Sequence, residues 1–118
     1  MIHKLKCMYV VNQVKMAKLP SFSEGELKRY GIVFSGKVQN VGFRLEASEM
    51  AKRLGLTGWV INLPNGDVQG EFQGTKEKID FLVDFMSSLK RIRIDSAKRT
   101  ELDVIPDEDS FSSDHKAP

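Results

Sequence analysis

The stretch FRLEASEMAKRLGLTGWVINLPNGDVQGEFQG, from Phe43 to Gly74, contains the signals for a helix, a strand, a tight turn and a second strand. Its first part places apolar residues at i, i+4, i+7, i+8 and i+11, which is one face of a helix: Phe43, Ala47, Met50, Ala51 and Leu54. Gly55 follows them, and glycine commonly ends a helix because it adopts the left-handed conformation at no steric cost.

The second part predicts a β-hairpin. LTGWVIN, residues 56–62, is typical of a strand, and Asn65-Gly66 is a strong hairpin signal because both residues tolerate positive φ. DVQGEFQG, residues 67–74, then returns as the partner strand. Alternation along this strand predicts one face toward the core and one outward, with Val68, Gly70 and Phe72 inward and Gln69, Glu71 and Gln73 outward.

The flanking sequence completes a pattern of strands and helices. RYGIVFSGKV, residues 29–38, predicts a first strand. Thr75 is a good N-cap for a second helix, whose apolar stripe is Ile79, Leu82, Val83, Met86 and Leu89. SAKRTELDVIP, residues 96–106, predicts a charge-rich strand at a sheet edge. The order β-α-β-β-α-β predicts an α+β, ferredoxin-like fold, an antiparallel sheet with two helices on one face.

The two ends of the chain differ in character from this pattern. Residues 1–27 contain scattered lysines and the segment LPSFSEGE, so we expect an N-terminal extension that is flexible. Residues 28–106 are expected to form the domain. Residues 107–118, DEDSFSSDHKAP, are predicted to be a loose polar C-terminal tail.

Composition limits the possible partners and compartment. A net charge of +2 over 118 residues is too mild to indicate a nucleic-acid surface. No apolar run reaches the ~20 residues of a membrane span, and CMYVV, residues 7–11, is too short for the core of a signal peptide. The single cysteine, Cys7, allows no internal disulfide, which is typical of a reducing compartment. We therefore expect a cytoplasmic monomer that binds neither membrane nor nucleic acid.

The chain offers few residues for conventional catalysis. His3, His115 and Cys7 lie in the terminal segments, and no spacing of ligands indicates a metal site. The glycine-containing stretches match neither the phosphate loop of nucleotide hydrolases nor the dinucleotide-binding fingerprint. An enzyme built on this chain is therefore predicted to work without a metal or cofactor, a histidine base or a thiol.

The stretch GKVQNVGFR, Gly36 to Arg44, indicates an anion site instead. Backbone N–H groups of a glycine-containing turn and of a first helical turn can converge on a phosphate-sized anion. Asn40 tolerates left-handed φ, and the guanidinium of Arg44 can pair with two phosphate oxygens. The alternative is that Arg44 is a solvated surface residue, which is the commoner case for an arginine at this position.

Two motifs in this chain resemble those of one family. GKVQNVGFR is similar to the acylphosphatase pattern G-x-V-Q-G-V-x-F-R, and GWVINLPNGDVQGEFQG resembles the second pattern, G-[FYW]-[AVC]-x-N-x-x-x-G-x-V with a later glycine. The similarity covers roughly Lys28 to Pro106. The resemblance implies a ferredoxin-like hydrolase acting on acyl phosphates, which are mixed anhydrides of carboxylic and phosphoric acid.

The resemblance also implies roles for individual residues. Arg44 would bind the phosphate, and Asn62 would orient the attacking water. The phosphate-binding loop would be Gln39, Asn40, Val41, Gly42 and Phe43. The alternative for Asn62 is a strand-end asparagine that bonds its own backbone.

Two departures from the family pattern stand out. Asn40 occupies a position where glycine is usual. The short final strand F-x-I-R-Y of many relatives is replaced by FSSDHKAP, in which Phe111 is the residue that remains.

Two other functions stay open at this point. One is a non-catalytic ferredoxin-like module that binds an anion or another ligand, since fold does not decide function. The other is an acylphosphatase-like accessory domain of a large carbamoyl-transfer maturation protein.

Overall fold

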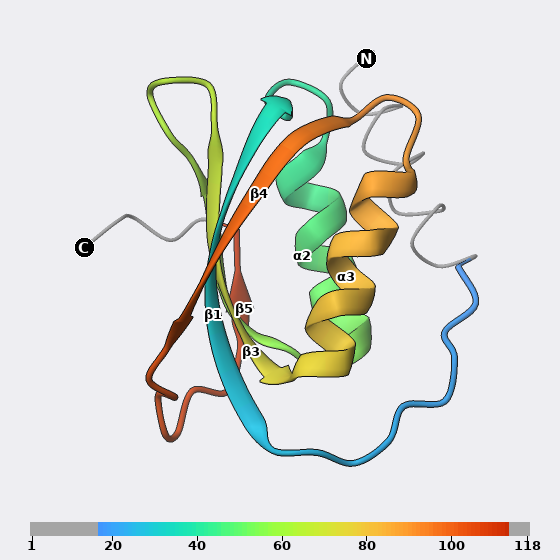
Figure 1. The fold of residues 1–118 in the computed structure, drawn as a ribbon, viewed down its shortest axis with the longest axis vertical. Coiled ribbons are helices and arrows are strands. Elements are labelled where there is room, and N and C mark those ends of the chain that lie inside the picture. The colour runs from blue at the N-terminus through green and yellow to red at the C-terminus, as the bar shows by residue number, and fades with distance from the viewer. Residues whose placement is uncertain (1–16, 114–118) are drawn as a thin grey trace.

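The computed structural model describes residues 17–113 and has two helices packed on one face of a five-stranded sheet (Figure 1). The sheet has the strand order β4-β1-β3-β2-β5. The elements in chain order are β1 Leu27–Lys37, α2 Phe43–Leu54, β2 Thr57–Asn62, β3 Val68–Thr75, α3 Lys76–Ser88, β4 Arg93–Leu102 and β5 Phe111–Ser112. The predicted β-α-β-β-α-β order and ferredoxin-like class are confirmed, with one further strand.

That further strand makes the sheet mixed rather than antiparallel throughout. β1 pairs antiparallel with both β3 and β4, and β2 pairs antiparallel with β3. β5 runs parallel to β2, with Gly58 opposite Phe111 and Trp59 opposite Ser112. The expectation of a purely antiparallel sheet is therefore wrong at this edge, because the chain crosses the sheet before it forms β5.

The core lies between the sheet and the helices. The side chains predicted for the inner face of α2 are all buried, as are Ile79, Leu82 and Met86 of α3. Phe34 is fully buried and its ring lies 4.9 Å from that of Phe43. The two helical stripes and the inward face of β3 thus form the core that the periodicity predicts.

The predicted helix ends and turns are also present. Gly55 ends α2 in the left-handed conformation, at φ 72°. Thr75 caps α3, where its side-chain oxygen accepts a hydrogen bond from the Lys78 amide at 3.4 Å. Gly66 has φ 97° in the turn between β2 and β3. These local signals therefore set the boundaries of α2 and α3 and the β2–β3 turn.

β4 lies at the sheet edge, as predicted, but it begins three residues earlier than expected. The register between β1 and β4 shifts at Ser35 and Gly36, and Gly36 pairs with Ile94. A Cβ at Gly36 would lie 2.2 Å from the Arg93 carbonyl oxygen. Gly36 therefore serves the close approach of β4 rather than the turn that precedes α2.

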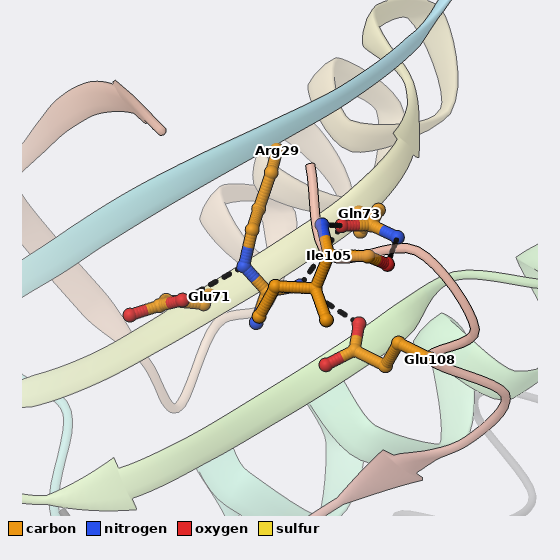
Figure 2. A network of polar contacts seen from close by, with 5 residues as sticks. All are labelled: Arg29, Glu71, Gln73, Ile105 and Glu108. Atoms are coloured by element: carbon orange, nitrogen blue, oxygen red, sulfur yellow. Dashed lines mark hydrogen bonds and ion pairs between the residues drawn. The ribbon is translucent and has the colours of Figure 1, made fainter. Parts of the chain in front are cut away.

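A segment of eight residues, 103–110, joins the opposite edges of the sheet across the face away from the helices. Arg29 is almost completely buried there and donates to Glu71, Gln73 and Glu108 (Figure 2). Gln73 in turn exchanges two hydrogen bonds of 2.9 Å with the backbone of Ile105. This polar network fastens the crossing segment to β1 and β3.

The network changes two expectations. Gln73 faces outward as predicted, but only 4% of it is exposed. The prediction that residues 107–118 form a loose tail is wrong for the described part, because Glu108 is ion-paired and Phe111 stacks on Phe72 at 5.5 Å. Phe111 therefore forms the final strand of which it was the expected remnant.

The described part of the N-terminal stretch, residues 17–26, also differs from the expected flexible extension. Leu19 and Phe22 pack against the core, and the ring of Phe22 meets that of Phe81 edge-to-face at 5.6 Å. Residues 1–16 and 114–118, and with them the predictions on His3, Cys7 and His115, lie outside the described residues. Between residues 17 and 113, no helix is long and apolar enough to cross a membrane.

Candidate active site

The loop between β1 and α2 carries most of the predicted site residues. Asn40 has φ 62° and Gly42 has φ 79°, so two left-handed residues lie within one short turn. Asn40 is one of the few non-glycine types that adopts this region readily. The prediction that Asn40 can take the place of the usual glycine is therefore confirmed for the backbone.

Gly42 is the N-cap of α2 and has no side chain with which to cap the helix. The first intrahelical hydrogen bond runs from the Glu46 amide to the Gly42 carbonyl at 3.0 Å. The earlier amides of the helix are left without an intrahelical acceptor, as in any helix start. These N–H groups, together with the positive end of the helix dipole, favour an anion at this point.

Gln39 ties this loop to the hairpin between β2 and β3. Its side-chain amide donates to the carbonyls of Leu63 at 2.7 Å and of Asp67 at 2.8 Å. Leu63 directly follows Asn62, the last residue of β2. The hydrogen bonds of Gln39 thus bring the predicted phosphate loop and the predicted water-orienting residue to the same end of the molecule.

Arg44 is exposed in the first turn of α2. Its guanidinium donates to the Ser113 carbonyl at a long 3.4 Å. Ser113 directly follows β5, so the short last strand brings a backbone acceptor to the arginine. The remaining donors of a guanidinium can still bind an anion, since the group has five N–H bonds.

The other predicted residues take different positions. Asn62 is exposed at the end of β2, where it pairs with Val68 across the sheet. Phe43 and Val41 are buried, so only their backbone groups can contact a bound anion. The structure therefore brings the loop and Asn62 together through Gln39, and it leaves Arg44 and Asn62 accessible to solvent.

Two residues beside the loop were missed by the sequence analysis. Glu46 is completely buried and forms an ion pair with Arg91, and Arg91 also donates to the Val41 carbonyl at 2.9 Å. Burial raises the pKa of Glu46, although the positive charge of Arg91 favours the ionised carboxylate. The available signal was the position of Glu46, three residues after Phe43 and so on the apolar face of α2.

Comparison with known proteins identifies the family of this fold and loop. The acylphosphatase family model matches residues 30–113. The chain belongs to the acylphosphatase family. The family match extends past residue 106, the expected end of the domain, and includes β5.

Individual acylphosphatases agree with this assignment. The acylphosphatase of Bordetella parapertussis is 39% identical over 64 residues, which cover 54% of this chain and 68% of that protein. The crystal structure of the Bacillus subtilis acylphosphatase superimposes with a TM-score of 0.69 at 26% identity, covering 76% of this chain and all of that one. A Coxiella burnetii acylphosphatase gives 0.67 at 31% identity, covering 74% and 92%.

The site contains no side chain of the kind that forms a covalent intermediate or shuttles a proton. The described loop and strand end present amide N–H groups, the guanidinium of Arg44 and the carboxamides of Gln39, Asn40 and Asn62. Within residues 17–113, no group of three His, Cys, Asp or Glu side chains is placed to hold a metal ion. The arrangement can bind an anion and align a water molecule, which are positioning and electrostatic tasks.

Proposed function

We propose that this acylphosphatase hydrolyses acyl phosphates by in-line attack of a positioned water, without a metal ion. In this proposal the amides of residues 39–43 and the guanidinium of Arg44 hold the phosphate. The side chain of Asn62 holds the water. The observation that carries the proposal is the pair of Gln39 hydrogen bonds, which hold the loop against the turn that follows Asn62, at Leu63 and Asp67.

The reaction requires few catalytic groups from the protein. The leaving group is a carboxylate, which departs without strong acid assistance. Phosphoryl transfer depends mainly on alignment and on stabilisation of charge at the phosphate oxygens. Arg44 and the loop amides would spread that charge, and a phosphate oxygen can accept the proton of the water. A carboxamide at Asn62 can both accept from and donate to the water and so hold it in line with the breaking P–O bond.

The proposal includes a cytoplasmic, monomeric protein whose partner is a small acyl phosphate. The single cysteine supports a reducing compartment. The modest net charge of +2 supports a small substrate rather than a nucleic acid.

The test is release of inorganic phosphate from benzoyl phosphate by the purified full chain in the presence of EDTA. We expect turnover well above spontaneous hydrolysis, with competitive inhibition by inorganic phosphate. Absence of turnover in folded protein would contradict the proposal and favour the non-catalytic anion-binding module. Loss of activity with EDTA that a divalent ion restores would contradict the metal-independent mechanism.

A further inference from the structure

A buried ion pair lies directly behind the phosphate loop. The side chain of Glu46 is completely buried, and its Oε2 accepts from Nη2 of Arg91. Nε of the same guanidinium donates to the Val41 carbonyl at 2.9 Å. Arg91 lies between α3 and β4, far from both residues in sequence. One planar guanidinium therefore connects a core carboxylate of α2 with the backbone of the loop.

This contact determines the orientation of one peptide group of the loop. The carbonyl of Val41 and the N–H of Gly42 belong to the same peptide unit, and the described chain has no cis peptide bond. In a planar trans unit these two groups point in opposite directions. Because the carbonyl points to Arg91, the Gly42 N–H points away from Arg91, to the other side of the loop.

Stability alone is a weak reason for this pair. Oε1 of Glu46 is buried and has no hydrogen-bond partner among residues 17–113. A buried carboxylate with an unsatisfied oxygen carries a desolvation cost, and apolar residues of similar volume often stabilise such a site equally well. What the pair does provide is a fixed position for the Arg91 guanidinium under the loop.

We propose that Arg91 and Glu46 are positioning residues of the phosphate site. Arg91 holds the Val41–Gly42 peptide so that its N–H faces the phosphate, and Glu46 holds Arg91. The negative charge of Glu46 also neutralises Arg91, so that Arg44 remains the charge that recognises the substrate. This inference rests on the proposed function, because it assumes that the loop binds phosphate.

The test compares Arg91→Gln and Arg91→Lys with the wild-type chain. For each folded protein, the inhibition constant of inorganic phosphate and the kcat and KM for benzoyl phosphate are measured. We expect Arg91→Gln to raise the inhibition constant and KM about tenfold, the size of one lost charge-assisted hydrogen bond. We expect kcat to change less, since loop contacts to phosphate act before and during reaction. Arg91→Lys should show a similar rise, because an ammonium cannot reproduce the planar two-pronged contact.

Arg99→Gln is the matched control. Arg99 is an arginine of similar side-chain exposure, 26% against 23% for Arg91, and it pairs with Asp80 on the α3 side of the sheet. For Arg99→Gln we expect the inhibition constant of inorganic phosphate to stay within about twofold of the wild-type value, the ordinary effect of a substitution remote from the site.

The outcomes separate the two proposals. An unchanged inhibition constant in Arg91→Gln would overturn the positioning role and leave a core ion pair. If Arg91→Gln does not fold, Arg91→Lys decides in the same way. An equal rise of the phosphate inhibition constant in the Arg99→Gln control would also overturn the positioning role of Arg91, because the loss of any similar arginine would then have the same effect. Failure of the wild-type chain to bind phosphate would instead refute the proposed function.

Discussion

Gln39→Leu should separate the loop from the hairpin while changing side-chain volume little. In the structure the Gln39 amide donates at 2.7 Å to Leu63 and at 2.8 Å to Asp67. Leucine can make neither hydrogen bond. The two carbonyls keep other partners, since Leu63 O accepts from the Gly66 amide and Asp67 O accepts from the Leu63 amide. The substitution therefore removes two hydrogen bonds but leaves no carbonyl without a donor.

The expected loss of stability and activity in Gln39→Leu follows from these two hydrogen bonds. Two neutral hydrogen bonds at about 1 kcal/mol each correspond to a loss of about 2 kcal/mol in unfolding free energy. For a domain of this size that lowers Tm by roughly 8–16 °C. Because the lost contacts align the loop with the strand end at Asn62, kcat should also fall, on the order of tenfold.

The assay is thermal unfolding followed by circular dichroism, together with steady-state hydrolysis of benzoyl phosphate at a temperature where the variant is folded. Gln69→Leu is the control. Gln69 lies in β3 on the outer face, is partly exposed and has no side-chain hydrogen bond among the described residues. Its effect should stay within about 0.5 kcal/mol. A Gln39→Leu chain with wild-type Tm and kcat would show that these hydrogen bonds neither stabilise the fold nor align the loop with Asn62.

Three further substitutions test other contacts. Glu108→Ala should lower the unfolding free energy by about 2 kcal/mol in urea, because the buried Arg29 loses a charged hydrogen bond of 2.8 Å. Phe22→Ala should lower Tm, because its edge-to-face contact with Phe81 is worth about 1 kcal/mol. Glu46→Gln should gain stability relative to wild type as pH rises above 4.5, the ordinary pKa of glutamate. Burial raises the pKa of Glu46, so the folded state binds this proton more tightly than the unfolded state, and ionisation costs folding free energy.

A specific result would contradict each of these three predictions. Unchanged urea stability of Glu108→Ala would show that the crossing segment is held without this ion pair. An unchanged Tm in Phe22→Ala would show that the contact between Phe22 and Phe81 adds nothing to the stability of the fold. If the stability of Glu46→Gln relative to wild type falls as pH rises, the charge of Arg91 has a larger effect on the pKa of Glu46 than burial has.

Local sequence patterns predict most of the fold. The period of α2, the Gly55 and Thr75 caps and the turn at Gly66 each depend on residues a few positions apart, and all are found in the structure. Asn65 does not share the positive φ of Gly66. The last strand was not predicted, because residues 107–113 are polar apart from Phe111 and β5 contains only two residues. Its stability comes from partners distant in sequence, such as Phe72, on which Phe111 stacks.

In the candidate site, too, the sequence identifies residues that lie in local motifs and misses residues whose contacts are distant in sequence. The loop and Arg44 form one continuous motif, and Asn62 is found only through the resemblance to the family. Arg91 gives no signal by itself, because it contacts Val41 and Glu46, residues 50 and 45 positions away. Glu46 does give a signal, since a charged residue within an apolar helical stripe needs a partner when it is buried.

In the proposed mechanism Arg44 binds the phosphate and Asn62 holds the water. The most direct measurement is the inhibition constant of inorganic phosphate beside kcat in Arg44→Ala and Asn62→Ala, both shown to be folded by circular dichroism. We predict that Arg44→Ala loses phosphate binding and turnover together. Asn62→Ala should lose kcat on the order of 10²-fold while phosphate still inhibits at the wild-type concentration. Wild-type phosphate inhibition in Arg44→Ala would rule out Arg44 as the phosphate ligand, and a wild-type kcat in Asn62→Ala would rule out Asn62 as the residue that holds the water.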